Sequence, residues 1–153
     1  MRFTRWWNPS LPQTLLYSVM LLYFNAAFSL FALMGLGIGG SAYSLAPVLF
    51  DSAFDSAARF DAVQTVAVLG GTLAYGFGGL GIANGQKLGW KVGVAVASGA
   101  VLLPVIAIGR GFSLGGTNII PFLFDLALLV LLVHPMSRSY QRIWFDGSSR
   151  PRR

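Results

Sequence analysis

The stretch that decides the fold covers residues 62–108 and reads AVQTVAVLGGTLAYGFGGLGIA, then NGQK, then LGWKVGVAVASGAVLLPVIAI. Each of its two apolar segments has at least the length of about 20 residues that a helix needs to cross the hydrocarbon core of a bilayer. In hydrocarbon every backbone N–H and C=O must be paired within helices or a closed barrel, and unbroken apolar runs favour helices over alternating barrel strands. The stretch therefore predicts two transmembrane helices joined by a short polar turn.

Two further apolar runs complete a prediction of four spans. They cover residues 15–36 and 119–133, and the last run becomes long enough if it begins at residue 117, with Asn118 and Pro121 in its first turn. The composition agrees, because 55% hydrophobic and 10% charged residues are too apolar for an ordinary soluble domain of 153 residues. We expect an all-α, four-helix transmembrane bundle that forms a single domain over residues 1–153, with spans at 15–36, 62–83, 88–108 and 117–133.

The positions of Lys and Arg predict the orientation. Nine of the eleven basic residues lie in the N-terminal tail, around the connection between the second and third spans, or in the tail over residues 135–153, whereas Arg59 and Arg110 lie on the other side. The positive-inside rule then places both termini in the cytoplasm, as expected for a multi-pass protein of a bacterial cytoplasmic (inner) membrane. The first apolar run is too long for the core of a secretory signal peptide, so we expect an uncleaved span.

The connection over residues 37–61 is expected to carry a short helix at the outer interface, between the first two spans. Its apolar residues are interspersed with the charged residues Asp51, Asp55, Arg59 and Asp61, as in amphipathic helices that lie on a membrane surface. We favour a helix that caps the bundle over a lid or a surface that docks a partner.

The C-terminal tail is expected to contact lipid headgroups. Ile143 and Trp144 share one face of a predicted helix with Tyr140, and Arg138 and Arg142 share another. Aromatic rings anchor helices at the headgroup level, and basic residues attract anionic lipid. The net charge of +6 follows this boundary pattern, so we expect the bilayer and its anionic headgroups as partners, and no nucleic acid.

Small residues at intervals of three or four mark the packing surfaces of the second and third spans. Gly71 and Gly78 lie in one of these spans, and Gly89 and Gly93 lie in the other. Such stripes let helix backbones approach closely. An intramolecular hairpin is the favoured interpretation, and the seam of a homodimer is the alternative.

Asp125 is the one ionisable residue well inside a predicted span. It lies about 9 Å below the outer end of the fourth helix, and a carboxyl group at that depth must find a partner within the protein. The candidate residues of this polar site are Asn25, Ser29, Arg110 and Asn118, with Thr65 and Thr72 as further candidates. We favour a structural staple made by hydrogen bonds, and the alternative is a proton- or cation-binding site of a small transporter.

The sequence supplies little for catalysis or for metal binding. It has no cysteine, no glutamate and a single histidine, His134, which is expected to act electrostatically at the C-terminal end of the fourth helix. Neither a bis-histidine haem site nor a carboxylate-rich metal centre can be assembled, and no histidine base lies at the depth of a nucleophile within the spans. We predict no catalytic residue, no metal, no cofactor and no enzymatic activity.

Two boundary stretches, NGQKLGWK at residues 84–91 and LVHPMSRSY at residues 132–140, resemble a group of small, uncharacterised four-span membrane proteins of actinobacteria. The resemblance covers the second half of the chain and carries over no catalytic residue. We expect a non-enzymatic accessory or assembly subunit of a membrane complex, with a larger membrane protein or further copies of itself as partner. The alternative is a homo-oligomeric small transporter or channel that uses Asp125.

Overall fold

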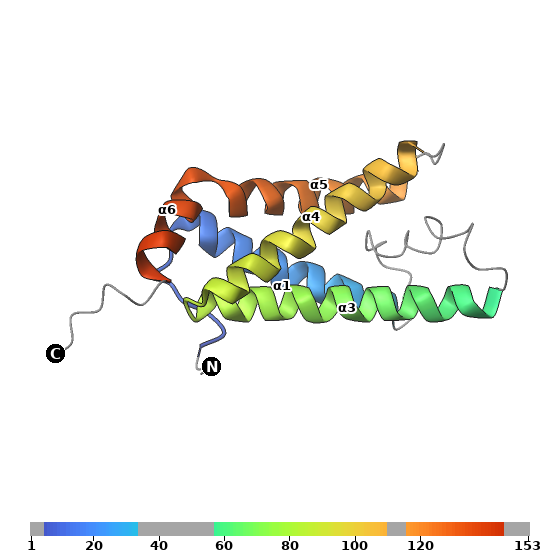
Figure 1. Ribbon diagram of the computed structural model, residues 1–153, viewed down its shortest axis with the longest axis horizontal. Coiled ribbons are helices and arrows are strands. Elements are labelled where there is room, and N and C mark those ends of the chain that lie inside the picture. The colour runs from blue at the N-terminus through green and yellow to red at the C-terminus, as the bar shows by residue number, and fades with distance from the viewer. Residues whose placement is uncertain (1–4, 34–56, 110–115, 146–153) are drawn as a thin grey trace.

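The computed structural model describes residues 5–33, 57–109 and 116–145 of the chain (Figure 1). These residues form five helices and no strand, which confirms the prediction of an all-α fold. The helices are α1 (Gln13–Leu33), α3 (Ala57–Ala83), α4 (Lys87–Gly109), α5 (Gly116–Val133) and α6 (Pro135–Trp144).

Three to four of these helices are long and apolar enough to cross a membrane. The qualifying segments of the first three are Gln13–Phe31, Thr65–Ala83 and Lys87–Ile106. A fourth span exists if Ile119–Val133 and Pro135–Trp144, which bend by 51° at their join, are taken together. The chain therefore has the helices of a multi-pass membrane protein, as the apolar runs predict.

The start of α3 differs from the predicted start of the second span. The helix begins at Ala57, whereas the span is predicted from residue 62, so residues 57–61 belong to α3 and not to a separate interfacial helix. These five residues contain neither glycine nor proline, so nothing in them interrupts the helix. The other residues predicted for the interfacial helix, 37–56, lie outside the described residues.

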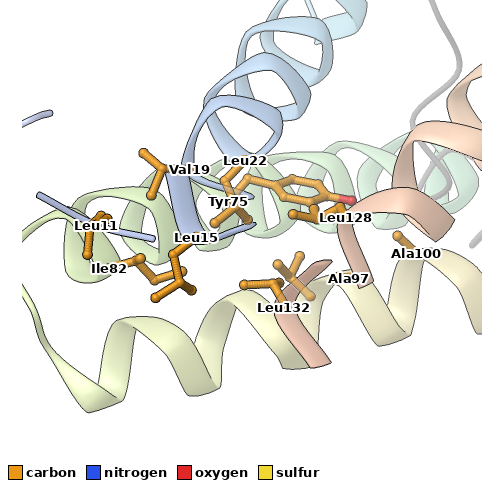
Figure 2. Close-up of a cluster of buried hydrophobic side chains, with 11 residues drawn as sticks. Leu11, Leu15, Val19, Leu22, Tyr75, Ile82, Ala97, Ala100, Leu128 and Leu132 are labelled. Atoms are coloured by element: carbon orange, nitrogen blue, oxygen red, sulfur yellow. The ribbon is translucent and has the colours of Figure 1, made fainter. Parts of the chain in front are cut away.

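The long helices pack around one apolar core. Both α1 and α4 contact α3 and α5, while α6 contacts α5 and α1. On α1, Leu15 and Leu22 are fully buried and face Ile82 of α3 and Leu132 of α5, within a single cluster. Figure 2 shows these side chains converging from three helices, with the ring of Tyr75 crossing among them.

The turn between α3 and α4 is closed by a Schellman motif. Gly85 has a φ of 67°, and its N–H donates to the carbonyl of Ile82 at 3.0 Å, while the N–H of Gln86 donates to the carbonyl of Gly81 at 2.8 Å. Glycine adopts this left-handed conformation without the steric cost that a Cβ atom brings. The motif reverses the chain within three residues and sets α3 and α4 side by side.

Both described ends of the chain lie next to this turn. The side-chain amide of Asn84 accepts from the N–H of Arg5 at 3.0 Å and donates to the Arg5 carbonyl at 2.6 Å. At the other end, the ring of Phe145 comes within 3.8 Å of where a Cβ atom on Gly85 would stand. In Figure 1 the start of α1, the α3–α4 turn and α6 accordingly lie at one end of the molecule.

Candidate functional site

Asp125 lies on the buried face of α5. It is only 4% exposed, and Leu128 and Leu132, three and seven residues later on the same face, are fully buried. Its neighbours Phe124 and Leu126 are each 38% exposed and point outward. The rotation of α5 therefore turns its one carboxyl group toward the other helices.

One oxygen of this carboxyl group joins three helices. Asp125 Oδ1 accepts a hydrogen bond from Asn25 Nδ2 of α1 at 2.7 Å and another from the hydroxyl of Tyr75 of α3 at 2.9 Å. Tyr75 is 2% exposed, and in Figure 2 its ring extends from α3 so that its hydroxyl oxygen ends beside Leu128 of α5. We call Asn25, Tyr75 and Asp125 the polar triad.

The free energy of these two hydrogen bonds is comparable with the cost of placing a carboxyl group inside a membrane helix. Placing an aspartate at the centre of a membrane helix costs about 2.5–3.5 kcal/mol on insertion scales. Interhelical hydrogen bonds within membranes contribute about 0.6 kcal/mol on average and ~1.7 kcal/mol at most. Two of them offset a substantial part of the insertion cost, and they do so only when α1, α3 and α5 are together.

An aromatic pair lies next to the polar triad on the outward side. Phe24 of α1 and Phe124 of α5, each one residue before a member of the triad, have ring centroids 5.3 Å apart. Phe24 also contacts Phe28, with centroids 4.3 Å apart. Aromatic pairs at these separations contribute favourable free energy in addition to that of the buried area. The seam between α1 and α5 is therefore held by an aromatic contact as well as by a hydrogen bond.

Among the predicted candidates for the polar site, the structure shows a contact with Asp125 for Asn25. Asn25 contacts Asp125, whereas Ser29, which is 2% exposed, forms no hydrogen bond with it. The hydroxyl of Thr72 donates to the carbonyl of Val68 in its own helix at 2.8 Å. Arg110 lies outside the described residues, and Asn118 lies in the first turn of α5, where only the backbone is described.

Tyr75 is the member of the triad that sequence reasoning missed. On the second span, only Thr65 and Thr72 were predicted as candidates for the polar site. A signal was present, because Tyr75 lies well inside an apolar run and a buried tyrosine hydroxyl usually finds a hydrogen-bond partner.

The packing glycines lie mostly between α3 and α4. A Cβ atom on Gly78 would stand 3.1 Å from the Cα atom of Gly93, and one on Gly81 would collide with the backbone of Gly89. Gly71, seven residues before Gly78 on α3, is also buried. Since these contacts are intramolecular, the hairpin interpretation accounts for them without a second copy of the chain.

His134 is the N-cap of α6, whereas its expected electrostatic role at the end of α5 stays a prediction. Its side-chain Nδ1 accepts from the N–H of Met136 at 3.3 Å, and Pro135 occupies the first helical position, where a missing N–H has no cost. The single histidine thus caps α6 at the bend between two helices, a role that was not predicted from the sequence.

The predicted lipid-contact residues all lie on α6. Arg138, Arg142 and Trp144 are exposed, while Ser137 and Gln141 of the same helix are buried. Among the described residues, no group of three or more His, Cys, Asp or Glu side chains comes together to hold a metal ion.

Comparison with protein-family models, with curated proteins and with solved structures finds no match to this chain. The resemblance to small four-span actinobacterial proteins stays a prediction.

Proposed function

We propose that the chain is a four-span helical membrane protein with both termini in the cytoplasm, and that it acts as a non-enzymatic accessory or assembly subunit of a membrane complex. Its partner is a larger membrane protein. In this proposal α5 alone, with 18 residues, is the fourth span, and α6 is a cytoplasmic helix that follows the bend.

The observation that carries this proposal is the inward placement of Asp125, the one acidic residue of the long helices whose side chain the structure describes. Asp125 accepts hydrogen bonds from two other helices, and Ser18 donates to the carbonyl of Thr14 within α1. The two hydrogen bonds of Asp125 join α5 to α1 and α3 and turn its carboxyl group away from the surface. A protein of this kind acts through its shape and its outer surface.

The outer surface of the long helices is apolar. Large hydrophobic side chains are exposed on every one of them, including Leu73 at 71% and Val66 at 70% on α3, Ile120 at 62% on α5 and Leu102 at 56% on α4. Such a surface is unstable in water but suits lipid or another membrane helix. An accessory subunit needs a face of this type to contact its partner within the bilayer.

The partner is tested by affinity purification of the tagged full-length chain from native membranes in a mild detergent. We expect a larger membrane protein to co-purify in constant ratio, and to be absent when an unrelated tagged membrane protein of similar length is used. Recovery of the chain alone, from membranes where it is expressed at its natural level, would contradict the accessory role.

The topology is tested with single cysteines, because the chain contains none. Ser139→Cys lies on the exposed side of α6, and Ser113→Cys lies in the connection between α4 and α5. In intact cells a membrane-impermeant thiol reagent should label Ser113→Cys and spare Ser139→Cys until the cells are opened. Labelling of both from outside would contradict the four-span arrangement.

One observation favours a second candidate, a small transporter or channel. Asp125 forms no ion pair with any described basic residue, and it lies where three helices meet near the middle of α5. Carboxyl groups in such positions serve proton and cation pathways in many membrane proteins. Purified protein in liposomes would then move protons or cations alone, and Asp125→Asn would abolish the flux; no flux from the wild type would remove this candidate.

A further inference from the structure

We propose that α6 forms a binding surface for acidic phospholipids at the end of the molecule where the α3–α4 turn lies. Arg138 and Arg142 bind the lipid phosphates on this surface. Met136, Ile143 and Trp144 enter the interface of the bilayer beside them. We call these five residues the α6 lipid surface. The inference requires that the long helices lie in a membrane, but it does not depend on the accessory role.

Buried polar side chains determine how α6 is rotated about its axis. Ser137 and Gln141, four residues apart on one face, are 0% and 6% exposed. The hydroxyl of Ser137 donates to the carbonyl of Leu131 at 2.7 Å and lies 3.0 Å from the hydroxyl oxygen of Thr14. An amphipathic helix that docks in water buries its apolar face, whereas α6 docks on α1 and α5 with polar side chains. Met136, Ile143 and Trp144 are consequently directed outward, whereas Tyr140 packs against the core.

Three large apolar side chains of α6 remain exposed. Met136 is 56% exposed, Ile143 57% and Trp144 65%. Met136 and Ile143 are seven residues apart and so share one side of the helix. At the end of the helix, the rings of Trp144 and Tyr140 stack with centroids 6.0 Å apart. Tryptophan at the end of a span favours the headgroup level, where its apolar body meets lipid and its N–H meets water.

The charged side of α6 matches an anion. Arg138 and Arg142, four residues apart, are both exposed, and Lys91 is exposed at the start of α4. Asp125 is the only acidic residue whose side chain the structure describes, and it lies far from them in the middle of α5. No described carboxylate therefore lies beside Arg138 and Arg142. Arginine is well suited to phosphate groups because its planar guanidinium binds two oxygens at once.

The position of α6 favours a lipid over a nucleic acid or an acidic peptide. Only His134 separates the last residue of α5 from the first residue of α6, and the two helices bend by 51°. A helix attached so closely to an apolar span remains at the level of the headgroups. A nucleic acid or an acidic peptide would contact the arginines but leave the exposed methionine, isoleucine and tryptophan in water. The bilayer interface accommodates both the basic and the apolar side chains.

In the test, the purified full-length protein in a neutral detergent is titrated with phosphatidylglycerol or with phosphatidylcholine. The melting temperature of the protein is measured at each lipid concentration. We expect phosphatidylglycerol to raise the melting temperature, and phosphatidylcholine at equal concentration to leave it unchanged. The double variant Arg138→Gln/Arg142→Gln should need roughly tenfold to thirtyfold more phosphatidylglycerol for the same effect. Trp144→Ala should weaken the response to a smaller extent and leave the melting temperature without lipid unchanged.

The matched control is Arg150→Gln/Arg152→Gln, which removes the same charge from the end of the chain and should change the response by less than about twofold. Inorganic phosphate and an oligonucleotide serve as soluble anions and should have no effect at the same concentration. Equal responses to the two lipids, equal losses in the two double variants, or a response to either soluble anion as large as the response to phosphatidylglycerol would each overturn the proposal.

Discussion

The α3–α4 and α1–α5 interfaces hold their helices together in different ways. Between α3 and α4 the glycine backbones meet directly, so that a Cβ atom on Gly81 would collide with Gly89. Between α1 and α5 the contact is made by side chains, through the hydrogen bond from Asn25 to Asp125 and the ring pair of Phe24 and Phe124. In hydrocarbon, where apolar burial does not drive helices together, close packing and polar bonds are the two means of association that remain.

The two interfaces are therefore sensitive to opposite kinds of substitution. The α3–α4 interface depends on the absence of side-chain atoms, so the addition of one methyl group is enough to disturb it. The seam between α1 and α5 depends on groups that are present, so it is disturbed by removing them. The first kind of change forces two backbones apart, while the second leaves neighbouring groups without partners, and the expected losses differ in size accordingly.

The largest effect is expected from Gly81→Ala. The added methyl group meets the backbone of Gly89, which cannot rotate away, and overpacking of this kind costs about 1–3 kcal/mol or more. The free energy of unfolding, measured by titration with a denaturing detergent in mixed micelles, should fall by that amount.

Its control is Gly70→Ala, on the same helix, where nothing lies within 4 Å of the new atom. Alanine favours the helix, so this variant should be unchanged or more stable by up to about 1 kcal/mol. If the two variants lost the same stability, the close approach of α3 and α4 would not be what stabilises the hairpin.

A smaller effect is expected from Asp125→Ala. This change removes the acceptor of the hydrogen bonds from Asn25 and Tyr75, and two bonds of the average ~0.6 kcal/mol each give an expected loss of about 1 kcal/mol. Asp125→Asn keeps an acceptor oxygen at the same place and should lose less in the same unfolding measurement. An alanine variant as stable as the wild type would show that Asp125 is not a staple.

The smallest effect is expected from Tyr75→Phe, which removes one hydroxyl group and retains the ring in the core. The loss should be about 0.6 kcal/mol and no more than ~1.7 kcal/mol, the range of interhelical hydrogen bonds in membranes. Tyr17→Phe, at a position that is 52% exposed on α1, is the matched control and should be neutral. Equal losses in the two variants would contradict a role for the Tyr75 hydroxyl in joining α3 to α5.

Two of the three members of the polar triad, Asp125 and Asn25, were predicted from the sequence. The depth of Asp125 along its helix predicts that it needs partners, and Asn25 was among the candidates. Depth alone also admitted Ser29, which is buried but makes no hydrogen bond with Asp125, and it passed over Tyr75. The choice among residues at similar depth depends on how each helix is rotated, and rotation is set by packing against helices far away in the sequence.

The amino-acid sequence is enough to predict the apolar helices, their approximate positions and the connections that carry the basic residues. These properties depend on contiguous residues, because the length of an apolar run and the charge beside it are local quantities. The tertiary structure alone decided that Tyr75 meets Asp125, that Gly81 meets Gly89 and that α6 docks with its polar face. Those outcomes depend on distances between helices that only their mutual packing settles.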